Sequence, residues 1–234
     1  MAEPGILYLV ATPIGNLEDI TTRAARILAE VDFIACEDTR TSGVLLKHLD
    51  VKKPLVPYHD FNEGKAADRI INRVIAGETG AVICDAGSPG ISDPGFVVAR
   101  TAIGRGVELI PIPGPSAMIA ALAVSGLPTD AFTFLGFLPP KSGKRRTLLE
   151  SLAERRETLI FYESPHKIKR LLGEVKEVLG NRHIALCREL TKKFEEVLRG
   201  TVHQVIERIG EKQPKGEITL VVEGKTRKSR KLAE

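Results

Sequence analysis

Asp85-Ala-Gly-Ser-Pro-Gly-Ile-Ser-Asp-Pro-Gly95 follows an apolar run, residues 81–84, that has no helical periodicity. Its glycines permit backbone conformations that a Cβ would forbid, its prolines stiffen the turns, and its serines and aspartates supply short polar groups. Asp93 is a candidate N-cap for the apolar segment 96–103, which we expect to be a helix. Open α/β sheets bind ligands with this order of strand, loop and helix. The stretch is therefore a candidate binding loop, and the alternative is an elaborate turn.

The usual phosphate-binding signatures are missing from the sequence. Neither a G-x-x-x-x-G-K-[ST] sequence nor a G-x-G-x-x-G fingerprint occurs in the chain. We therefore do not expect a ligand of this loop to be held by its phosphates.

An apolar run, a loop and a helix follow one another five times in the first half of the chain. We call the loops that follow the runs the loaded loops, because they are rich in glycine and polar residues. The loops that return from the helices look like ordinary turns. Such units favour a mostly parallel sheet with helices on both faces, and the loaded loops then meet at one edge. The expected strands are 6–10, 31–36, 55–58, 81–84 and 107–112, and the expected helices are 20–31, 43–49, 65–76, 96–103 and 117–124.

A turn-rich break at residues 125–129 suggests a domain boundary, so we expect an N-terminal α/β domain of residues 1–124 and a C-terminal α/β domain of residues 125–234 with a mixed sheet. The second half carries a basic loop, 138–146, and a basic tail, 225–231. The expected strands there are 132–137, 158–162, 184–188, 197–201 and 218–222, and the expected helices are 147–155, 168–179 and 202–209.

The composition is that of a globular protein, since 43% of the 234 residues are hydrophobic and 27% are charged. The longest uncharged apolar stretch, 117–124, is far shorter than the roughly 20 residues of a membrane helix. Glu3 and Pro4 stand where a secretory peptide would be basic and then apolar. We therefore expect a cytoplasmic protein that does not enter the membrane.

Cys36, Cys84 and Cys187 lie in separate apolar runs, which predicts three reduced, buried thiols rather than a disulfide or metal site. The histidines also lack ligand spacing, so we expect no metal. The net charge of +4 permits an anionic partner without requiring one.

Several further motifs, taken together with the 85–95 loop, resemble the tetrapyrrole methylase superfamily of methyltransferases that use S-adenosylmethionine. Within it they are most similar to the branch of ribosomal RNA small subunit methyltransferase I. They span nearly the whole chain in order: 11–21 (ATPIGNLEDIT), 37–41 (EDTRT), 113–117 (PGPSA), 136–139 (GFLP), 162–166 (YESPH), 188–192 (RELTK) and 215–217 (KGE).

The resemblance implies two α/β domains, a methyl donor held in the cleft between them, and a homodimer. It also implies the reaction, which is methyl transfer to the ribose 2′-hydroxyl of a cytidine in the decoding region of 16S rRNA in the small ribosomal subunit. Members of this branch often continue into a small extra domain after the last strand, where this chain has a basic tail ending at Glu234.

By position in these motifs, the resemblance implies a set of donor contacts. These are Ile14, Asp85, Gly87, Ser88, Gly90, Ile91, Ser116, Ala117, Tyr162, Leu190 and Glu217.

The acceptor side is open to more than one interpretation. Glu37, Asp38 and Arg40 are the catalytic candidates, because a carboxylate pair beside an arginine can orient and polarise a hydroxyl group. The alternative is a salt-bridged network that only shapes the loop, and Glu189 has the same two interpretations. The RNA-binding candidates are Lys141, Lys144, Arg145 and Arg146, whose alternative is a solvated surface.

Two other functions remain open. One is methylation of a small molecule, a tetrapyrrole, by a member of the same superfamily. The other is a non-catalytic, ribosome-associated RNA-binding protein. Motifs 37–41 and 162–166 favour the RNA branch, and the intact glycine loop with Ser116 favours an enzyme. Aromatic residues make up only 5% of the chain, which argues against base stacking as the main mode of recognition.

Overall fold

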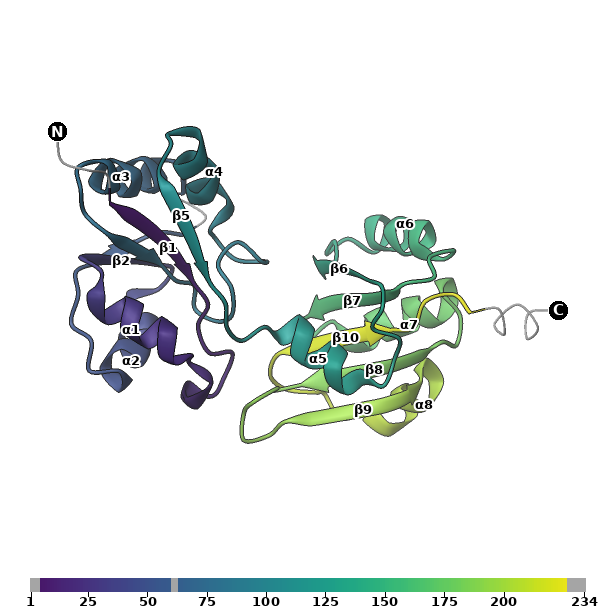
Figure 1. Cartoon of the computed structure of the whole chain (residues 1–234). Coiled ribbons are helices and arrows are strands. Elements are labelled where there is room, and N and C mark those ends of the chain that lie inside the picture. Colours follow the sequence, from purple (N-terminus) through teal and green to yellow (C-terminus); the bar gives the residue numbers. More distant parts are fainter. Residues whose placement is uncertain (1–4, 60–62, 227–234) are drawn as a thin grey trace. The chain divides into compact units, whose positions relative to one another are not determined.

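A computed structural model describes residues 5–59 and 63–226 of the chain (Figure 1). The chain forms two compact units, Met1–Ser116 and Ala117–Glu234, each of which is described by itself below. The division lies earlier than the predicted boundary after residue 124. The reason is that helix α5 (Ala117–Ser125) packs on the sheet of the second unit, where Ala121 and Leu122 join its core.

The first unit is a five-stranded, fully parallel sheet in the order β3-β2-β4-β1-β5. This confirms the α/β class and the parallel sheet that the sequence predicts. The strands are β1 (Ile6–Val10), β2 (Phe33–Cys36), β3 (Leu55–Pro57), β4 (Gly80–Val82) and β5 (Glu108–Ile112). The helices are the short 3-10 helix η1 (Leu17–Asp19), α1 (Thr22–Glu30), α2 (Thr39–His48), α3 (Glu63–Ile75) and α4 (Phe96–Gly104).

Helices cover both faces of this sheet. Successive strand residues point to opposite faces, and both sets are apolar here, so each face needs a helix layer to bury it. Phe33 and Ala35 of β2 join one core with α3 and α4, while Ile34 and Cys36 join the other with α1 and α2. Figure 1 shows the two helix pairs on opposite faces. A strand buried on both faces is apolar throughout, which is why the sequence shows continuous runs rather than alternation.

The strand order creates a switch point between β1 and β4. The connection from β1 leads through α1 to β2 on one side, whereas the connection from β4 leads through α4 to β5 on the other. From these neighbouring strands the chain passes to helices on opposite faces of the sheet, α1 on one and α4 on the other. This is the position where open α/β sheets bind their ligands.

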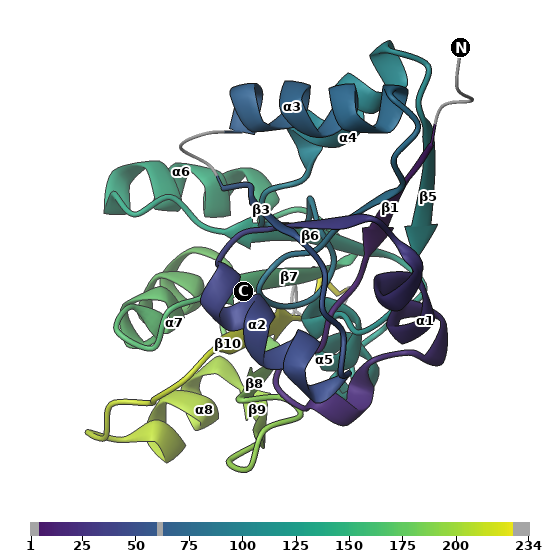
Figure 2. The ribbon, with the colours of Figure 1, turned by 90° about the vertical axis from the view of Figure 1, so that its left-hand side faces the viewer.

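The second unit holds a five-stranded mixed sheet in the order β6-β7-β10-β8-β9. Strands β6 and β7 are parallel and the other neighbours are antiparallel, which confirms the mixed sheet. Its strands are β6 (Phe132–Phe137), β7 (Thr158–Glu163), β8 (His183–Arg188), β9 (Glu196–Thr201) and β10 (Ile218–Val222). Helices α6 (Ser142–Leu152), α7 (Ile168–Val178) and α8 (Val202–Ile209) cover one face and α5 packs on the other (Figure 2).

Two helices begin earlier than the sequence predicts. Helix α2 starts at Thr39, because the side chain of Asp38 accepts a hydrogen bond from the backbone N–H of Arg40 and caps it. Helix α6 starts at Ser142, so most of the predicted basic loop is helical. Its buried residues Arg145, Leu149 and Leu152 follow the spacing of one helix face, but a charged residue opens the series and hides the pattern.

Within residues 5–59 and 63–226, none of the helices has the length and apolar character needed to cross a bilayer.

Candidate functional site

The loops after β1 and β4 are joined to each other at the carboxyl edge of the first sheet. Thr12 and Gly87 exchange two backbone hydrogen bonds, of 2.8 and 3.1 Å. The hydroxyl of Thr12 donates to the carbonyl of Cys84 at 3.1 Å, where the glycine loop begins. Thr12 is itself almost fully buried. Thr12 is not among the predicted site residues, although it lies in the 11–21 motif at a strand end.

The loop after β5 also lies close to Gly87, at the carboxyl edge of the sheet. A Cβ added to Gly87 would lie 3.6 Å from Cγ2 of Ile14 and 4.0 Å from the carbonyl oxygen of Pro115. Pro115 directly precedes Ser116, so three predicted donor contacts, Ile14, Gly87 and Ser116, belong to segments that meet here. The left-handed φ of 79° at Gly87 also favours glycine.

The rest of the glycine loop is folded tightly on itself. The N–H of Gly90 donates to the carbonyl of Pro94 at 3.1 Å, and the N–H of Ile91 donates to that of Ser88 at 3.2 Å. A Cβ on Gly95 would lie 2.5 Å from the nitrogen of Gly90, so this close approach requires glycine. Ser88 is half-buried and Ile91 is exposed, so Ile91 is an accessible apolar side chain on a rigid loop.

The predicted cap of α4 is wrong. Gly95, rather than Asp93, is the N-cap, and as a glycine it has no side chain with which to cap the helix. Instead the hydroxyl of Tyr58 accepts the N–H of Val98 at 3.2 Å, and a carboxylate oxygen of Glu63 accepts the N–H of Gly95 at 3.3 Å. The Tyr58 hydroxyl in turn donates to Glu63 at 2.9 Å. Two residues distant in sequence thus cap α4 and anchor the end of the loop.

The catalytic candidates differ in their electrostatic state. Arg40 donates to both carboxylate oxygens of Asp38, the shortest contact being 2.6 Å, and this pairing lowers the pKa of Asp38 to about 2. The Arg40 side chain is 90% exposed and its pKa is raised by the same contact. Glu37 is half-buried at the end of β2. Asp38 is therefore a firmly ionised, weakly basic carboxylate.

Asp85 has the opposite tendency. Its Oδ1 accepts the backbone N–H of Asp38 at 3.3 Å, which brings the loops after the neighbouring strands β2 and β4 together. Loss of solvation raises the pKa of Asp85, and the charge of Asp38 adds to the rise. Its side chain stays exposed, so a substrate can reach it. The structure thus makes Asp85, predicted as a donor contact, the stronger base of the pair.

In the second unit, Glu189 links two of the predicted donor contacts. Its Oε1 accepts the backbone N–H of Glu217 at 3.0 Å and lies 3.3 Å from Nζ of Lys192, and the first of these bonds is the main cause of its lowered pKa. A Cβ on Gly216 would overlap the Glu189 carboxylate. Glu189 therefore connects Leu190, its chain neighbour, to the Glu217 segment. Of the two interpretations of Glu189, this arrangement favours a salt-bridged network that shapes the loop.

The basic candidates separate into surface and core residues. Lys141 and Lys144 are exposed, and Arg146 is half-buried and pairs with Glu177. Arg145 is only 2% exposed, and its assignment as an RNA contact is corrected by the structure. Its Nη2 donates to Glu174 at 2.8 Å and its Nη1 to the carbonyls of Pro139 and Pro140.

The basic tail lies mainly outside the described residues, which end at Thr226. Lys225 is described and pairs with Glu154.

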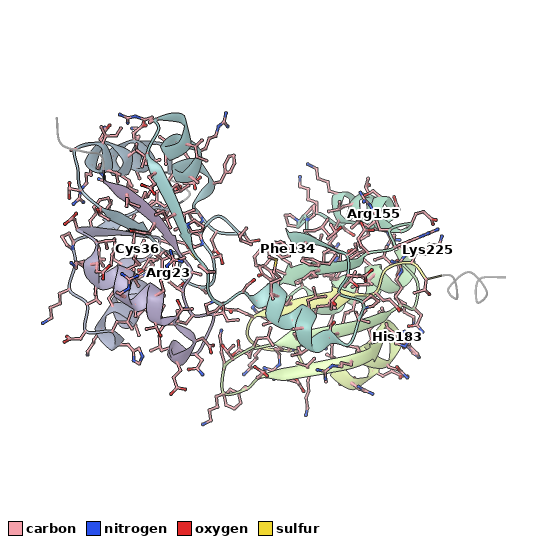
Figure 3. All side chains as sticks on the ribbon, in the orientation of Figure 1. Arg23, Cys36, Phe134, Arg155, His183 and Lys225 are labelled. Carbon is pink, nitrogen blue, oxygen red and sulfur yellow. The ribbon has the colours of Figure 1, made fainter. Side chains whose placement is uncertain are left out.

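All three cysteines are buried free thiols, of which Cys36 is labelled in Figure 3. Burial is the main cause of their raised pKa values. In the described parts of the chain, no group of three or more His, Cys, Asp or Glu side chains is arranged to hold a metal ion.

The fold consists of two α/β units, and the first carries its glycine-rich and acidic loops at one edge of a parallel sheet. The sequence matches the family model of the Tetrapyrrole (Corrin/Porphyrin) Methylases over residues 6–206, which gives the class of the protein. Among solved structures, diphthine synthase aligns with a TM-score of 0.72 over 95% of this chain and 91% of that one, at 14% identity. Uroporphyrin-III-C-methyltransferase from Thermus thermophilus aligns with a TM-score of 0.67 over 93% and 94% of the two chains, at 23% identity. At these identities the likeness is one of fold.

Similarity to curated relatives narrows the class. Ribosomal RNA small subunit methyltransferase I of Halalkalibacterium halodurans is 51% identical over 222 residues, which are 95% of this chain and 77% of that protein. Its namesake in Bacillus subtilis is 46% identical over 95% of this chain and 76% of that protein. The chain therefore belongs to the ribosomal RNA small subunit methyltransferase I family of the tetrapyrrole methylases.

Proposed function

We propose that this protein transfers a methyl group from S-adenosylmethionine to the ribose 2′-hydroxyl of a cytidine in the decoding region of 16S rRNA. The substrate is the small ribosomal subunit, and the enzyme works as a cytoplasmic homodimer. The observation that supports this most is the joined edge of the first sheet, where the loops of β1, β4 and β5 meet in a chain 51% identical to a methyltransferase of this name.

The first-unit residues fit this donor in charge and shape. The edge carries the carboxylates of Glu37, Asp38 and Asp85, of which Arg40 neutralises one. Such an edge repels a phosphate and suits a ligand with cationic groups. S-adenosylmethionine supplies a methyl group already activated on a sulfonium and has no phosphate. The backbone of the glycine loop with Ile14 and Ser116 is proposed to hold it in the first unit. Ala117, Tyr162, Leu190 and Glu217 of the second unit stay proposed donor contacts by their place in the motifs.

The proton of the ribose hydroxyl is the second requirement of the reaction. A ribose hydroxyl is a weak acid, and its oxygen becomes a better nucleophile as the proton is taken away. Asp85 is proposed to accept this proton, because its raised pKa makes it more basic than an ordinary aspartate. Asp38 is too weak a base for this step, and with Arg40 it is proposed to orient the hydroxyl. Glu37 stays a candidate for the same orienting role.

Lys141, Lys144 and Arg146 are proposed to contact RNA phosphates. They lie at the beginning of α6, and their charges project from the second unit without forming part of its core. Contacts of this kind add affinity and orientation rather than sequence specificity.

The proposal is tested with small ribosomal subunits from a strain that lacks the gene. Incubation with the purified protein and S-adenosylmethionine carrying a labelled methyl group is expected to label 16S rRNA, and mapping is expected to find the label on one decoding-region ribose. Label on a base, on another RNA or only on a tetrapyrrole would refute the proposed acceptor. An absence of donor binding by calorimetry in well-folded protein would refute the methyltransferase itself.

A Ser88→Lys variant tests the donor site separately. A bulky charge at Ser88 is expected to abolish donor binding while the protein stays folded, because this side chain lies on the rigid glycine loop.

A further inference from the structure

The strand β6 has an irregularity that places an aromatic ring on an accessible surface. Phe134 pairs with Ile160 of β7, but the next pair joins Phe137 to Tyr162, so β6 holds one extra residue between them. Gly136 lies in this bulge with a left-handed φ of 60°. Without the extra residue, Gly136 would take the place beside Tyr162. The bulge thus moves Phe137 to the face of the sheet that carries Phe134 and Tyr162.

These three rings form a cluster. The ring of Tyr162 lies 4.9 Å from that of Phe134 and 5.7 Å from that of Phe137, with interplanar angles of 68° and 63°. Both contacts are edge-to-face arrangements, which stabilise aromatic pairs. Phe134, labelled in Figure 3, also packs against the core under α5. The ring of Phe137 is therefore held in place by its contact with Tyr162.

Phe137 nevertheless exposes 61% of its surface within its unit. Helix α5 packs mainly on β10 and β8, inner strands of the sheet, rather than over the end of the edge strand β6. Phe137 therefore forms a small exposed aromatic cluster with the half-buried Tyr162, and clustered apolar side chains mark binding surfaces more often than single ones do.

Charge indicates the partner. Lys141 and Lys144 are exposed and follow Phe137 after a short turn, in which the carbonyls of Pro139 and Pro140 are fixed by the buried Arg145. Proteins bind single-stranded nucleic acid by combining accessible aromatic rings, which stack on bases, with cations that contact the phosphates.

We propose that Phe137, braced by Tyr162 and Phe134, is a stacking platform for an unpaired nucleobase of the RNA substrate. The proposal rests on the proposed function and adds to it a contact that reads the unstacked state of the RNA. It concerns a residue of the 136–139 motif to which the reaction itself gives no role.

The test compares Phe137→Leu with Phe137→Tyr on small ribosomal subunits that lack the modification. Leucine keeps an apolar side chain but has no ring face, so KM for subunits is expected to rise about five- to fiftyfold, in line with the contribution of one stacked base. Phe137→Tyr retains the ring and is expected to keep the wild-type KM. The value of kcat and the donor dissociation constant, measured by calorimetry, are expected to stay unchanged in both variants.

The matched control is Phe132→Leu, the same change at the other end of β6, where the side chain is 40% exposed. It is expected to leave KM for subunits unchanged. An unchanged KM in Phe137→Leu, or a rise in Phe137→Tyr or Phe132→Leu as large as that in Phe137→Leu, would overturn the proposal. A weaker donor affinity with an unchanged KM for subunits would assign the platform to the donor instead. Failure of the wild-type protein to methylate subunits would refute the proposed function and not the platform alone.

Discussion

At the scale of single residues, the two aspartates of the first unit show that position in a motif does not determine chemical role. Asp38 and Asp85 lie in loops after neighbouring strands and are joined by one hydrogen bond. The Arg40 guanidinium holds the pKa of Asp38 at about 2, while loss of solvation raises the pKa of Asp85. An aspartate is therefore a fixed anion at position 38 and an available base at position 85.

Asp85→Asn is expected to lower kcat by about 10²- to 10⁴-fold, the usual contribution of a positioned general base. In the wild-type enzyme kcat is expected to fall as the pH drops through the raised pKa of Asp85, because protonation removes the base. Asp38→Asn removes a negative charge that raises the pKa of Asp85, so it is expected to slow the reaction and to move this acid limb to lower pH without abolishing it. The measurement is the pH dependence of kcat with saturating donor. An acid limb that survives in Asp85→Asn would show that another group accepts the proton.

At the scale of elements, the pair of Arg145 and Glu174 holds α6 against α7. Both side chains are buried, and Ser142 also donates to Glu174, at 2.7 Å. Because Arg145 also donates to the carbonyls of Pro139 and Pro140, the pair fixes the turn that carries Lys141. A charge that looked like an RNA contact in the sequence is thus part of the second core.

Arg145→Ala is expected to reduce the free energy of unfolding by about 3–5 kcal/mol, because the buried Glu174 carboxylate loses its main cationic partner and keeps Ser142 and the more distant Arg170. Arg146→Ala is expected to cost less than about 1 kcal/mol, because Arg146 is half-buried and its ion pair with Glu177 is open to solvent. Urea unfolding at neutral pH measures both values. Equal losses in the two variants would contradict the core role of Arg145.

The same pair predicts a pH dependence of stability. Arg145 lowers the pKa of Glu174 from 4.5 to about 2, so the pair stabilises the fold above pH 4.5. This stability is lost as the pH falls from 4.5 towards 2, since the unfolded chain then binds the proton more readily. Arg145→Ala is expected to show a smaller loss over this range.

At the scale of the whole molecule, the net charge of +4 is less informative than its distribution. Glu37, Asp38 and Asp85 lie at the carboxyl edge of the first sheet, while Lys141 and Lys144 are exposed at the beginning of α6 in the second unit. This separation lets one surface suit a cationic donor and another the phosphates of RNA.

Replacement of Lys141 and Lys144 by glutamine is expected to weaken subunit binding and flatten its salt dependence. Each lost phosphate contact lowers the logarithmic salt slope by about 0.7 to 0.9. Donor affinity is expected to stay unchanged. The matched control replaces Lys47 and Lys52, two exposed lysines near the amino end of β3, and is expected to leave the slope unchanged. An unchanged slope in the Lys141 and Lys144 variant would exclude these residues as phosphate contacts.

The sequence by itself determined the order of the elements, the parallel first sheet and the edge that gathers the glycine loop. These properties depend on patterns that run along the chain: apolar runs, glycines that require unusual backbone angles, and loaded loops after strand ends. The positions 12, 87 and 115 come together because parallel strands must end at the same edge.

Only the tertiary structure decided which partner each side chain has. Arg145 is buried because Glu174, on the next helix, neutralises it, and Tyr58 and Glu63 accept hydrogen bonds from the backbone at the start of α4. One extra residue in β6 decided that Phe137 lies beside Tyr162. The physical reason is common to all three: burial, charge pairing and strand register depend on residues far apart in the sequence, and no local pattern specifies them.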